Sequence, residues 1–329
     1  FVSLSAEGYT GYGEAAPNRR YNEDARKVVH FLKQLDLSFW ERVQFPEQLP
    51  ELLDAIEPPV YSAKAAVETA YLDWWAKKRN KPLYALWGAE TNIGPRTSFT
   101  IGIDEPASIA EKVNEAEKFN LLKVKLSGEQ QQDQTIIQTI RQYTDKPLRV
   151  DINEGWQTLE QAKKGISYLA DNNIDLVEQP MPASCRTELC ELHSYSPLKL
   201  CADESFTSRE YIEDIKKAFD VINIKLMKSG SLIRSKSIIE KAEKAGIKVM
   251  IGCMVESSLA DTASAILALW ADYADLDGHL LISNDPFNGL QIDKQNRIRL
   301  PEQRNGIGAR PNLDWLEMKN QYPDFDSSP

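Results

Sequence analysis

Five short apolar segments of this chain each lead into a charged residue, and the residue types could perform acid–base chemistry beside a metal ion. Consecutive charged residues lie 22 to 27 positions apart, about the length of one strand and one helix. A buried charge is costly unless another group pairs with it or binds it. The regular series therefore indicates a shared site rather than scattered surface charges. The residues are Lys125, Asp151, Glu178, Asp203 and Lys225.

Carboxylates occupy three consecutive positions of this series, at Asp151, Glu178 and Asp203. Three carboxylates without a histidine suit a hard cation that keeps water or accepts a substrate oxygen, which indicates Mg²⁺, with Mn²⁺ as the alternative. Each carboxylate alone could instead cap the next helix or pair with a lysine. Their occurrence on three consecutive predicted strands favours a metal site.

Lysines flank the carboxylates in the series. Lys123 and Lys125 lie two positions apart on a predicted strand, so both side chains project from the same face. Two ammonium groups that close repel each other, which lowers the pKa of the inner one and suits a base near neutral pH. Lys225 would face Lys125 across the pocket, and a base on each side of one carbon allows racemisation or epimerisation. A salt bridge to Asp203 or Glu204 is the alternative role for Lys225.

A second acidic pair, Asp275 and Asp277, lies just before a predicted strand at 279–283. The pair could bind a cationic group, although a solvated turn is the commoner role of an Asp-x-Asp-Gly sequence. Its place in the chain favours function, because the polar segment 254–258 ends the preceding strand and would contribute to the same rim.

Other candidate residues receive no role in catalysis. Lys228 lies in the loop after Lys225, and we expect it to be a solvated charge. The histidines His30, His193 and His279 have no metal-ligand spacing. The sequence contains no P-loop, nucleophile elbow or dinucleotide-binding glycine motif.

From Thr97 onward, short apolar strands alternate with segments of helical periodicity. Continuous apolar strands separated by helices predict an α/β fold with a parallel sheet that helices cover. Seven or eight repeats favour a modified (β/α)₈ TIM-type barrel, in which the carboxyl ends of the strands form the site. The predicted helical segments are Ala107–Asn120, Thr158–Asn172, Thr207–Phe219 and Ser231–Ala245.

The chain divides into three predicted parts. Residues 1–97 contain a strand and then helices, the clearest over Val60–Lys78, and form an α+β capping domain. Residues 98–288 form the catalytic barrel. Residues 289–329 form a C-terminal segment that returns to the capping domain. The chain opens at Phe1 in what reads as the middle of a strand, so we expect further residues before it.

Bulk properties exclude several classes of protein. The net charge is −10 and the pI about 5.1, and no basic stripe suitable for nucleic acid is present. No apolar run approaches the roughly 18 residues that a membrane span needs. The four cysteines lack metal-type spacing, which is typical of reduced thiols in a cytoplasmic protein.

These motifs together resemble the enolase superfamily, in which lysine or histidine bases act with Mg²⁺ to stabilise an ene-diolate. Lys123-Val124-Lys125 together with Lys225 is similar to the muconate-lactonizing-enzyme subgroup. The mandelate-racemase subgroup would have a histidine near the end of the barrel, and His279 is not placed as that base would be. Asp275-Leu276-Asp277 resembles the motif of dipeptide epimerases, of which Ala-Glu epimerases are best known. The turn Gly11–Pro17 extends the resemblance to the capping domain.

The resemblance implies a role for each residue of the site. Three carboxylates would bind Mg²⁺, two lysines would transfer protons, and a third lysine would neutralise the substrate carboxylate and tune one of the bases. The acidic pair would bind the dipeptide ammonium, and one threonine matches a substrate contact loosely. In that order, the residues are Asp151, Glu178 and Asp203; Lys125 and Lys225; Lys123; Asp275 and Asp277; and Thr100.

The activity that the resemblance implies is Mg²⁺-dependent epimerisation of the C-terminal residue of a dipeptide. Ala-Glu from peptidoglycan recycling is the default substrate, and the family is compatible with a homo-oligomer. Cycloisomerisation or dehydration, as in muconate lactonization or o-succinylbenzoate synthesis, is an alternative that gives no use for the acidic pair. A metal-binding scaffold barrel is the non-enzymatic alternative, and it would need neither base.

Capping loops carry part of the specificity in this family. The first, flexible loop is not recognisable in the sequence. The second lies around Asn18–Tyr21, where Arg19 and Arg20 could contact an acidic side chain, although adjacent arginines in a loop are more often solvated.

Overall fold

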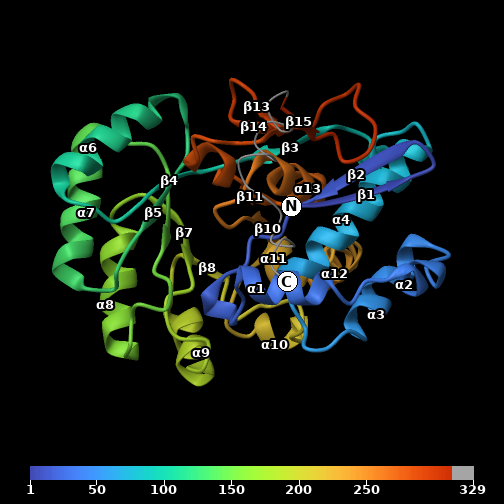
Figure 1. Ribbon diagram of the computed structural model, residues 1–329. Helices are drawn as coiled ribbons and strands as arrows, with labels where there is room; N and C mark the ends of the chain where they lie inside the picture. Colours follow the sequence, from blue (N-terminus) through green and yellow to red (C-terminus); the bar gives the residue numbers. More distant parts are fainter. Residues whose placement is uncertain (313–329) are drawn as a thin grey trace.

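The computed structural model describes residues 1–312, and within them eight parallel strands form one sheet (Figure 1). Each strand lies beside its neighbour in the chain, in the order β11-β10-β9-β8-β7-β6-β5-β4. A bridge between Thr97 and Ala274 joins the first strand to the last, so the predicted barrel is confirmed. The strands are β4 (Phe99–Ile101), β5 (Leu122–Lys125), β6 (Leu148–Asp151), β7 (Ile174–Glu178), β8 (Lys199–Ala202), β9 (Val221–Lys225), β10 (Lys248–Gly252) and β11 (Tyr273–Asp275).

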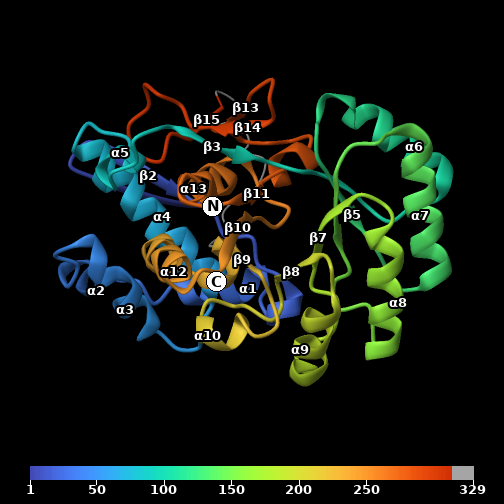
Figure 2. The ribbon, with the colours of Figure 1, turned by 180° about the vertical axis from the view of Figure 1, so that it is seen from behind.

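Helices surround the barrel, as the two opposite views show (Figures 1 and 2). Polar side chains begin several of them: Thr158 accepts a hydrogen bond from the backbone N–H of Gln161, and Ser231 accepts one from that of Arg234. Gly246 ends α12 in the left-handed conformation. The helices are α6 (Pro106–Glu115), α7 (Gln130–Tyr143), α8 (Leu159–Ala170), α9 (Arg186–Tyr195), α10 (Ile212–Ile215), α11 (Leu226–Ser229), α12 (Leu232–Ala245) and α13 (Ser258–Ala268).

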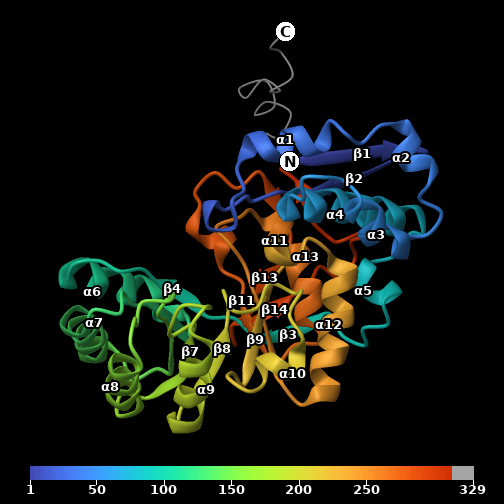
Figure 3. The ribbon, with the colours of Figure 1, turned by 90° about the horizontal axis from the view of Figure 1, so that it is seen from below.

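The N-terminal part packs a hairpin and several helices against one end of the barrel (Figure 3). Helix α4 is buried on most sides because β2 covers one face and α11 another. A small core separate from that of the barrel includes Phe31, Leu53 and Val67. The elements are β1 (Val2–Ala6), β2 (Tyr9–Gly13), α1 (Ala25–Leu32), α2 (Leu37–Glu41), α3 (Leu49–Asp54), α4 (Tyr61–Lys78) and α5 (Leu83–Leu86).

The described part of the C-terminal segment contacts the N-terminal part. The backbone N–H of Leu83 donates to the carbonyl of Gly306 (2.7 Å), and that of Ile307 donates to Asp73 Oδ1 (2.9 Å). Residues 313–329 lie outside the described residues, and the proposed domain boundaries stay predictions. Short strands complete the segment: β3 (Ile93–Arg96) pairs with β14 (Arg297–Arg299), β14 with β13 (Gln291–Ile292), and β12 (Phe287–Asn288) with β15 (Arg310–Pro311).

The predicted strand at 279–283 is wrong. The last barrel strand is β11, and residues Gly278–Leu281 form a short 3-10 helix instead. Extended pairing stops there because Asp261 Oδ2 accepts hydrogen bonds from both the backbone N–H and the Nδ1 of His279, at 2.8 and 2.6 Å. Asp275 therefore ends the eighth strand and Asp277 follows it, so the acidic pair stands at the carboxyl end of the barrel.

The helix predicted over Thr207–Phe219 is also mostly wrong, because only α10 is helical there. The backbone N–H and the hydroxyl of Thr207 both donate to the Glu210 carboxylate, and Ser208 has a φ of 70°. These local bonds hold a turn where the periodicity indicated a helix. Among the described residues, no helix combines the length and apolar character that crossing a membrane requires.

The packing of β2 on α4 predicts that Gly13→Ala destabilises the fold. A Cβ at Gly13 would lie 1.9 Å from the carbonyl oxygen of Ala66, so the hairpin would have to move away from the helix. We expect the free energy of unfolding to fall by about 1–3 kcal/mol in urea titrations. Gly102→Ala is the control, because nothing lies within 4 Å of a Cβ there. Equal effects of the two changes would contradict this explanation.

Candidate active site

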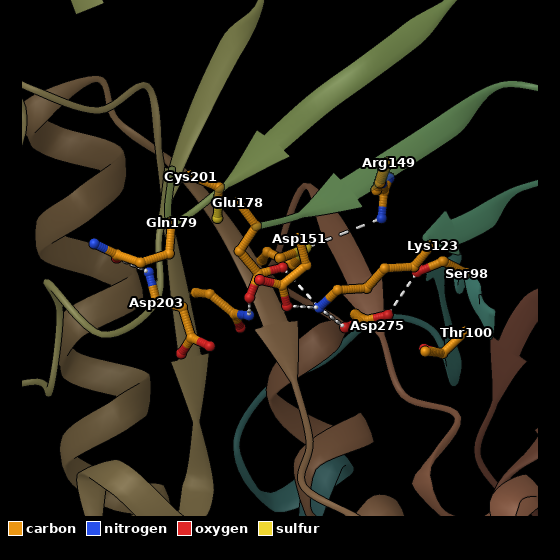
Figure 4. Close-up of polar contacts among 12 residues, drawn as sticks. Ser98, Thr100, Lys123, Arg149, Asp151, Glu178, Gln179, Cys201, Asp203 and Asp275 are labelled. Carbon is orange, nitrogen blue, oxygen red and sulfur yellow. Dashed lines mark hydrogen bonds and ion pairs between the residues drawn. The ribbon is translucent and has the colours of Figure 1, made fainter. Parts of the chain in front are cut away.

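The three predicted metal ligands lie together at the carboxyl ends of adjacent strands (Figure 4). Asp151 and Glu178 are register partners on β6 and β7, and Asp203 follows β8 directly. One oxygen from each carboxylate lies within 4.8 Å of the others. All three are buried, with exposed fractions of 0, 1 and 2%. The strand ends therefore place three hard oxygen donors around one point.

This donor set fits a hard divalent cation. Glu178 Oε2 is buried and accepts no aligned hydrogen bond from the described residues, although Lys123 Nζ lies 2.7 Å away. Burial and the charge of Asp151 raise the pKa of Glu178, so its carboxylate lacks compensation in the protein alone. Oxygen ligands of this kind are those that Mg²⁺ and Mn²⁺ prefer. Asp151, Glu178 and Asp203 could together hold such an ion.

Lys123 is the central positive charge of the cluster. Its Nζ lies 2.6 Å from Asp275 Oδ2, 2.7 Å from Glu178 Oε2 and 3.1 Å from Asp151 Oδ2 (Figure 4). Burial alone would lower the pKa of Lys123, but these three carboxylates raise it well above its usual value. Lys123 therefore stays charged, and it is suited to neutralise negative charge rather than to accept a proton.

Lys125 lies farther out on the same strand, with 32% of its side chain exposed. Its Nζ donates to Asp151 Oδ2 (2.7 Å) and to Asn153 Oδ1 (3.0 Å). Lys123 and Lys125 thus contact the same oxygen of Asp151, and this shared carboxylate offsets the repulsion expected between the two ammonium groups. Of the two, Lys125 is the more exposed, although both lysines line the pocket above the cluster.

Lys225 approaches from the other side of the carboxylates, at the end of β9. Its Nζ donates to Asp203 Oδ2 (2.8 Å), so the salt bridge left open by the sequence is present. Burial alone would lower the pKa of Lys225, but Asp203 and Glu178 raise it well above its usual value. Three strands, β6 to β8, separate Lys225 from Lys125, so the two lysines flank the carboxylates.

A pocket of about 880 Å³ opens above the cluster, within the size range of small-molecule sites. Lys125 and Lys225 line it, together with Thr100 of β4. The capping loop supplies the other wall, where Arg20 pairs with Glu154 of the barrel. Arg20 is therefore not a purely solvated charge, since it links the loop to the β6 end.

The acidic pair lines the same pocket and joins the last strand of the barrel to the first. Asp275 Oδ1 accepts a hydrogen bond from the Ser98 hydroxyl, and Asp277 Oδ2 accepts one from the Thr100 backbone N–H, both at 2.6 Å. Burial opposes ionisation of Asp275, but Lys123 lowers its pKa to about 2. Burial and the nearby charge of Asp275 raise the pKa of Asp277 to about 7. A cation in the pocket would stabilise the ionised form of Asp277.

The prediction that Lys228 is a solvated charge is wrong. Only 2% of this residue is exposed, and its Nζ contacts the Asp203 carboxylate. The one-turn helix α11 begins directly after Lys225 and turns the chain inward, so the residue three positions later points toward the β8 end. The sequence showed a charged residue in a loop and did not indicate this reversal.

Two supporting residues were also missed. Asn223 Nδ2 donates to Glu178 Oε1 (2.8 Å), and the Ser98 hydroxyl holds Asp275. A signal for both was available, because each lies two positions before a predicted site residue, and extended backbone places two such residues on one face. Asn223 lies within β9, and Ser98 stands directly before β4. Asn223 precedes Lys225 in this way, and Ser98 precedes Thr100.

A second group of donor atoms lies beside the pocket, from Cys253, Glu256 and Asp261. No lysine pairs with it among the described residues. Burial and the charge of Asp261 raise the pKa of Glu256 well above its usual range, and Asp261 has His279 as its partner in place of a lysine. Asp151, Glu178 and Asp203 differ because a lysine lies within ion-pair distance of each, although Lys123 compensates the charge of Glu178 only in part.

A family model described as enolase C-terminal domain-like matches residues 106–315. The chain belongs to this family. The match spans most of the barrel, and it confirms the resemblance to the enolase superfamily on which the sequence analysis relied.

Individual relatives extend over both parts of the chain. An L-Ala-D/L-Glu epimerase of Bacteroides thetaiotaomicron is 40% identical over 295 residues, which is 88% of this chain and 76% of that protein. A dipeptide epimerase of Cytophaga hutchinsonii, solved with Mg and D-Ala-L-Val, has a TM-score of 0.84 at 29% identity, over 95% of this chain and 88% of that one. An N-succinyl Arg/Lys racemase of Bacillus cereus has a TM-score of 0.85 at 29% identity, with the same coverage.

The raised pKa of Asp277 predicts a pH-dependent difference between the wild-type protein and Asp277→Asn. The folded protein holds the Asp277 proton more tightly than the unfolded chain, so this residue lowers stability as pH rises from about 4 to about 7. Since the pKa rises from 3.8 to about 7, the change amounts to at most about 4 kcal/mol. Urea unfolding at pH 4.5 and pH 8 measures it. A wild-type-minus-variant difference that is the same at both pH values would contradict this assignment.

Proposed function

We propose that this protein is a Mg²⁺-dependent epimerase of dipeptides that inverts the α-carbon of the C-terminal residue. One observation carries the proposal: Lys125 and Lys225 flank a buried cluster of three carboxylates in a single pocket. A scaffold barrel would need neither lysine. The relatives described above, two named epimerases and one a racemase, support the same class of chemistry.

The substrate carboxylate would bind at the carboxylate cluster. A Mg²⁺ ion held by Asp151, Glu178 and Asp203 would supply positive charge where negative charge develops as the α-proton leaves. Lys123 adds a fixed positive charge, because three carboxylates keep its ammonium protonated and in place. The carboxylate and the adjacent α-carbon would thereby be held between the two flanking lysines.

Proton transfer would use the two lysines in turn. One lysine removes the α-proton from its side of the carbon, and the other returns a proton on the opposite side, which inverts the centre. In the structure both ammonium groups are paired with carboxylates, Lys125 with Asp151 and Lys225 with Asp203. A lysine must be uncharged before it can act as the base, and a carboxylate partner favours its charged form. Binding of the ion by Asp151 and Asp203 in place of the lysines would therefore favour activity.

The substrate's ammonium group would bind Asp277. This carboxylate lines the pocket, is 3% exposed and is held by the Thr100 backbone N–H. Asp275 contributes less directly, because Lys123 and Ser98 already occupy its two oxygens. The pair therefore gives a dipeptide with a free N-terminus a partner that an N-acylated amino acid would not use.

Ala-Glu is the default substrate, on the strength of the Bacteroides thetaiotaomicron relative, and it would connect the protein to peptidoglycan recycling in the cytoplasm. The capping loop offers Arg20 for an acidic side chain, in competition with Glu154. The Cytophaga hutchinsonii structure holds D-Ala-L-Val, so apolar dipeptides are included in the tests below.

Racemisation of an N-acylated amino acid is the second candidate, favoured by the likeness to the Bacillus cereus racemase. Such a substrate has no ammonium group. Asp277→Asn should therefore weaken turnover of dipeptides at least 10-fold while leaving N-acylamino acids unaffected. Turnover of N-acylamino acids without turnover of any dipeptide would favour the second candidate.

The proposed activity predicts α-deuteration of dipeptides in D₂O. The protein is incubated with Mg²⁺ and a library of L,L-dipeptides, with N-succinylamino acids in parallel, and mass spectrometry locates the deuterium. We expect exchange at the C-terminal residue of a subset that includes Ala-Glu, and its loss on chelation of the metal. Absence of exchange in every dipeptide would refute the epimerase proposal.

The two-base arrangement predicts opposite selectivities for Lys125→Met and Lys225→Met. Each variant should lose epimerisation by about 10²–10⁴-fold. Each should still exchange the α-proton of one epimer, because the surviving lysine faces only one side of the carbon, and the favoured epimer should differ between variants. Lys217→Met is the control, since Lys217 forms an exposed pair with Asp214. Exchange of the same epimer by both variants would rule out two opposed bases.

A further inference from the structure

Lys228 is the most completely buried cation beside the predicted metal ligands, and the proposed reaction assigns it no role. It comes from α11, three residues after Lys225. Its Nζ donates to Oδ1 of the Asp203 carboxylate. It also donates to three backbone carbonyls, those of Asp203 (2.7 Å), Phe206 (3.0 Å) and Asn223 (3.1 Å). These acceptors come from the loop after β8 and from β9. The side chain therefore has a single position fixed by both strands.

Two lysines contact different oxygens of the Asp203 carboxylate. Lys228 contacts Oδ1, and Lys225 contacts Oδ2. The surroundings of the two lysines differ: Lys225 lines the pocket, whereas Lys228 does not and is held by carbonyl groups as well. Oδ2 can thus exchange its partner for a ligand in the pocket, while Oδ1 keeps its contact.

We infer that Lys228 is the positioning residue of the metal site: it fixes Asp203 so that one oxygen faces Asp151 and Glu178. This inference rests on the proposed Mg²⁺ site. Groups that orient a metal ligand in this way can change metal affinity 10- to 100-fold when they are removed. Lys228 touches neither substrate nor ion in this arrangement, and its effect passes through Asp203 alone.

Simple electrostatics makes the opposite prediction. A buried ammonium so close to the ligands repels a cation, so its removal would tighten Mg²⁺ binding if charge alone mattered. If Lys228 instead orients the carboxylate, its removal frees Asp203 to rotate and weakens binding. Weaker Mg²⁺ binding after removal of Lys228 would therefore indicate a positioning role, and tighter binding would indicate an effect of its charge alone.

The experiment measures Mg²⁺ affinity by titration calorimetry without substrate, for wild type, Lys228→Met, Lys228→Gln and the control Lys217→Met. If Lys228 positions Asp203, the dissociation constant for Mg²⁺ should be 10- to 100-fold higher in Lys228→Met than in wild type. Lys228→Gln should lie between, because its amide keeps two N–H donors. Lys217→Met should match wild type. Unchanged or tighter binding by a folded Lys228→Met would overturn the inference.

Folding is monitored by near-ultraviolet circular dichroism, and Lys228→Gln carries the test if Lys228→Met does not fold. A crystal structure of the wild-type protein with Mg²⁺ provides a test without any variant. Lys228 should still contact Asp203 Oδ1 while the ion contacts the other oxygen, and loss of the Lys228 contact would overturn the inference. If the wild-type protein binds no Mg²⁺, the proposed metal site itself fails, which is a distinct outcome.

Discussion

The interaction on which the site depends is the buried contact of Lys123 with three carboxylates. Asp151, Glu178 and Asp275 come from β6, β7 and β11, and their charges could not share a dry barrel end without a cation among them. Lys123 supplies that cation from β5 and keeps it, because its pKa is raised. One lysine thus allows three carboxylates to be buried together.

Closure of the barrel and construction of the pocket use the same residues. A bridge between Thr97 and Ala274 connects the backbones of the first and last strands, and side chains strengthen this seam. The Ser98 hydroxyl binds Asp275, and the Thr100 backbone N–H binds Asp277. The acidic pair is therefore both a structural seam and the wall that would face a substrate ammonium, which ties substrate recognition to the integrity of the fold.

The barrel and the convergence of its charged residues could be predicted because both follow from strand periodicity. A charge that ends a parallel strand must lie at the carboxyl face, whatever its partners are. Details that depend on local turns were not predictable in this way: the inward turn of α11 buries Lys228, and bonds from His279 to Asp261 replace a strand with a short helix. Which oxygen meets which lysine depends on side-chain rotamers, and spacing in a sequence carries no information on those.

A buried carboxylate helps to position the N-terminal part against the barrel. Glu14, in the turn after β2, accepts hydrogen bonds from the Ser257 and Ala260 backbone N–H groups at the start of α13. A carboxylate at a helix N-terminus satisfies amides that would otherwise lack partners. The start of α13 lies near the end of β10. The contact with Glu14 therefore fixes the capping loop over the strand ends that carry the charged residues of the pocket. Residues 15–18 and Arg20 then line the pocket, so substitutions in this short loop can change which molecule fits without moving Lys125 and Lys225.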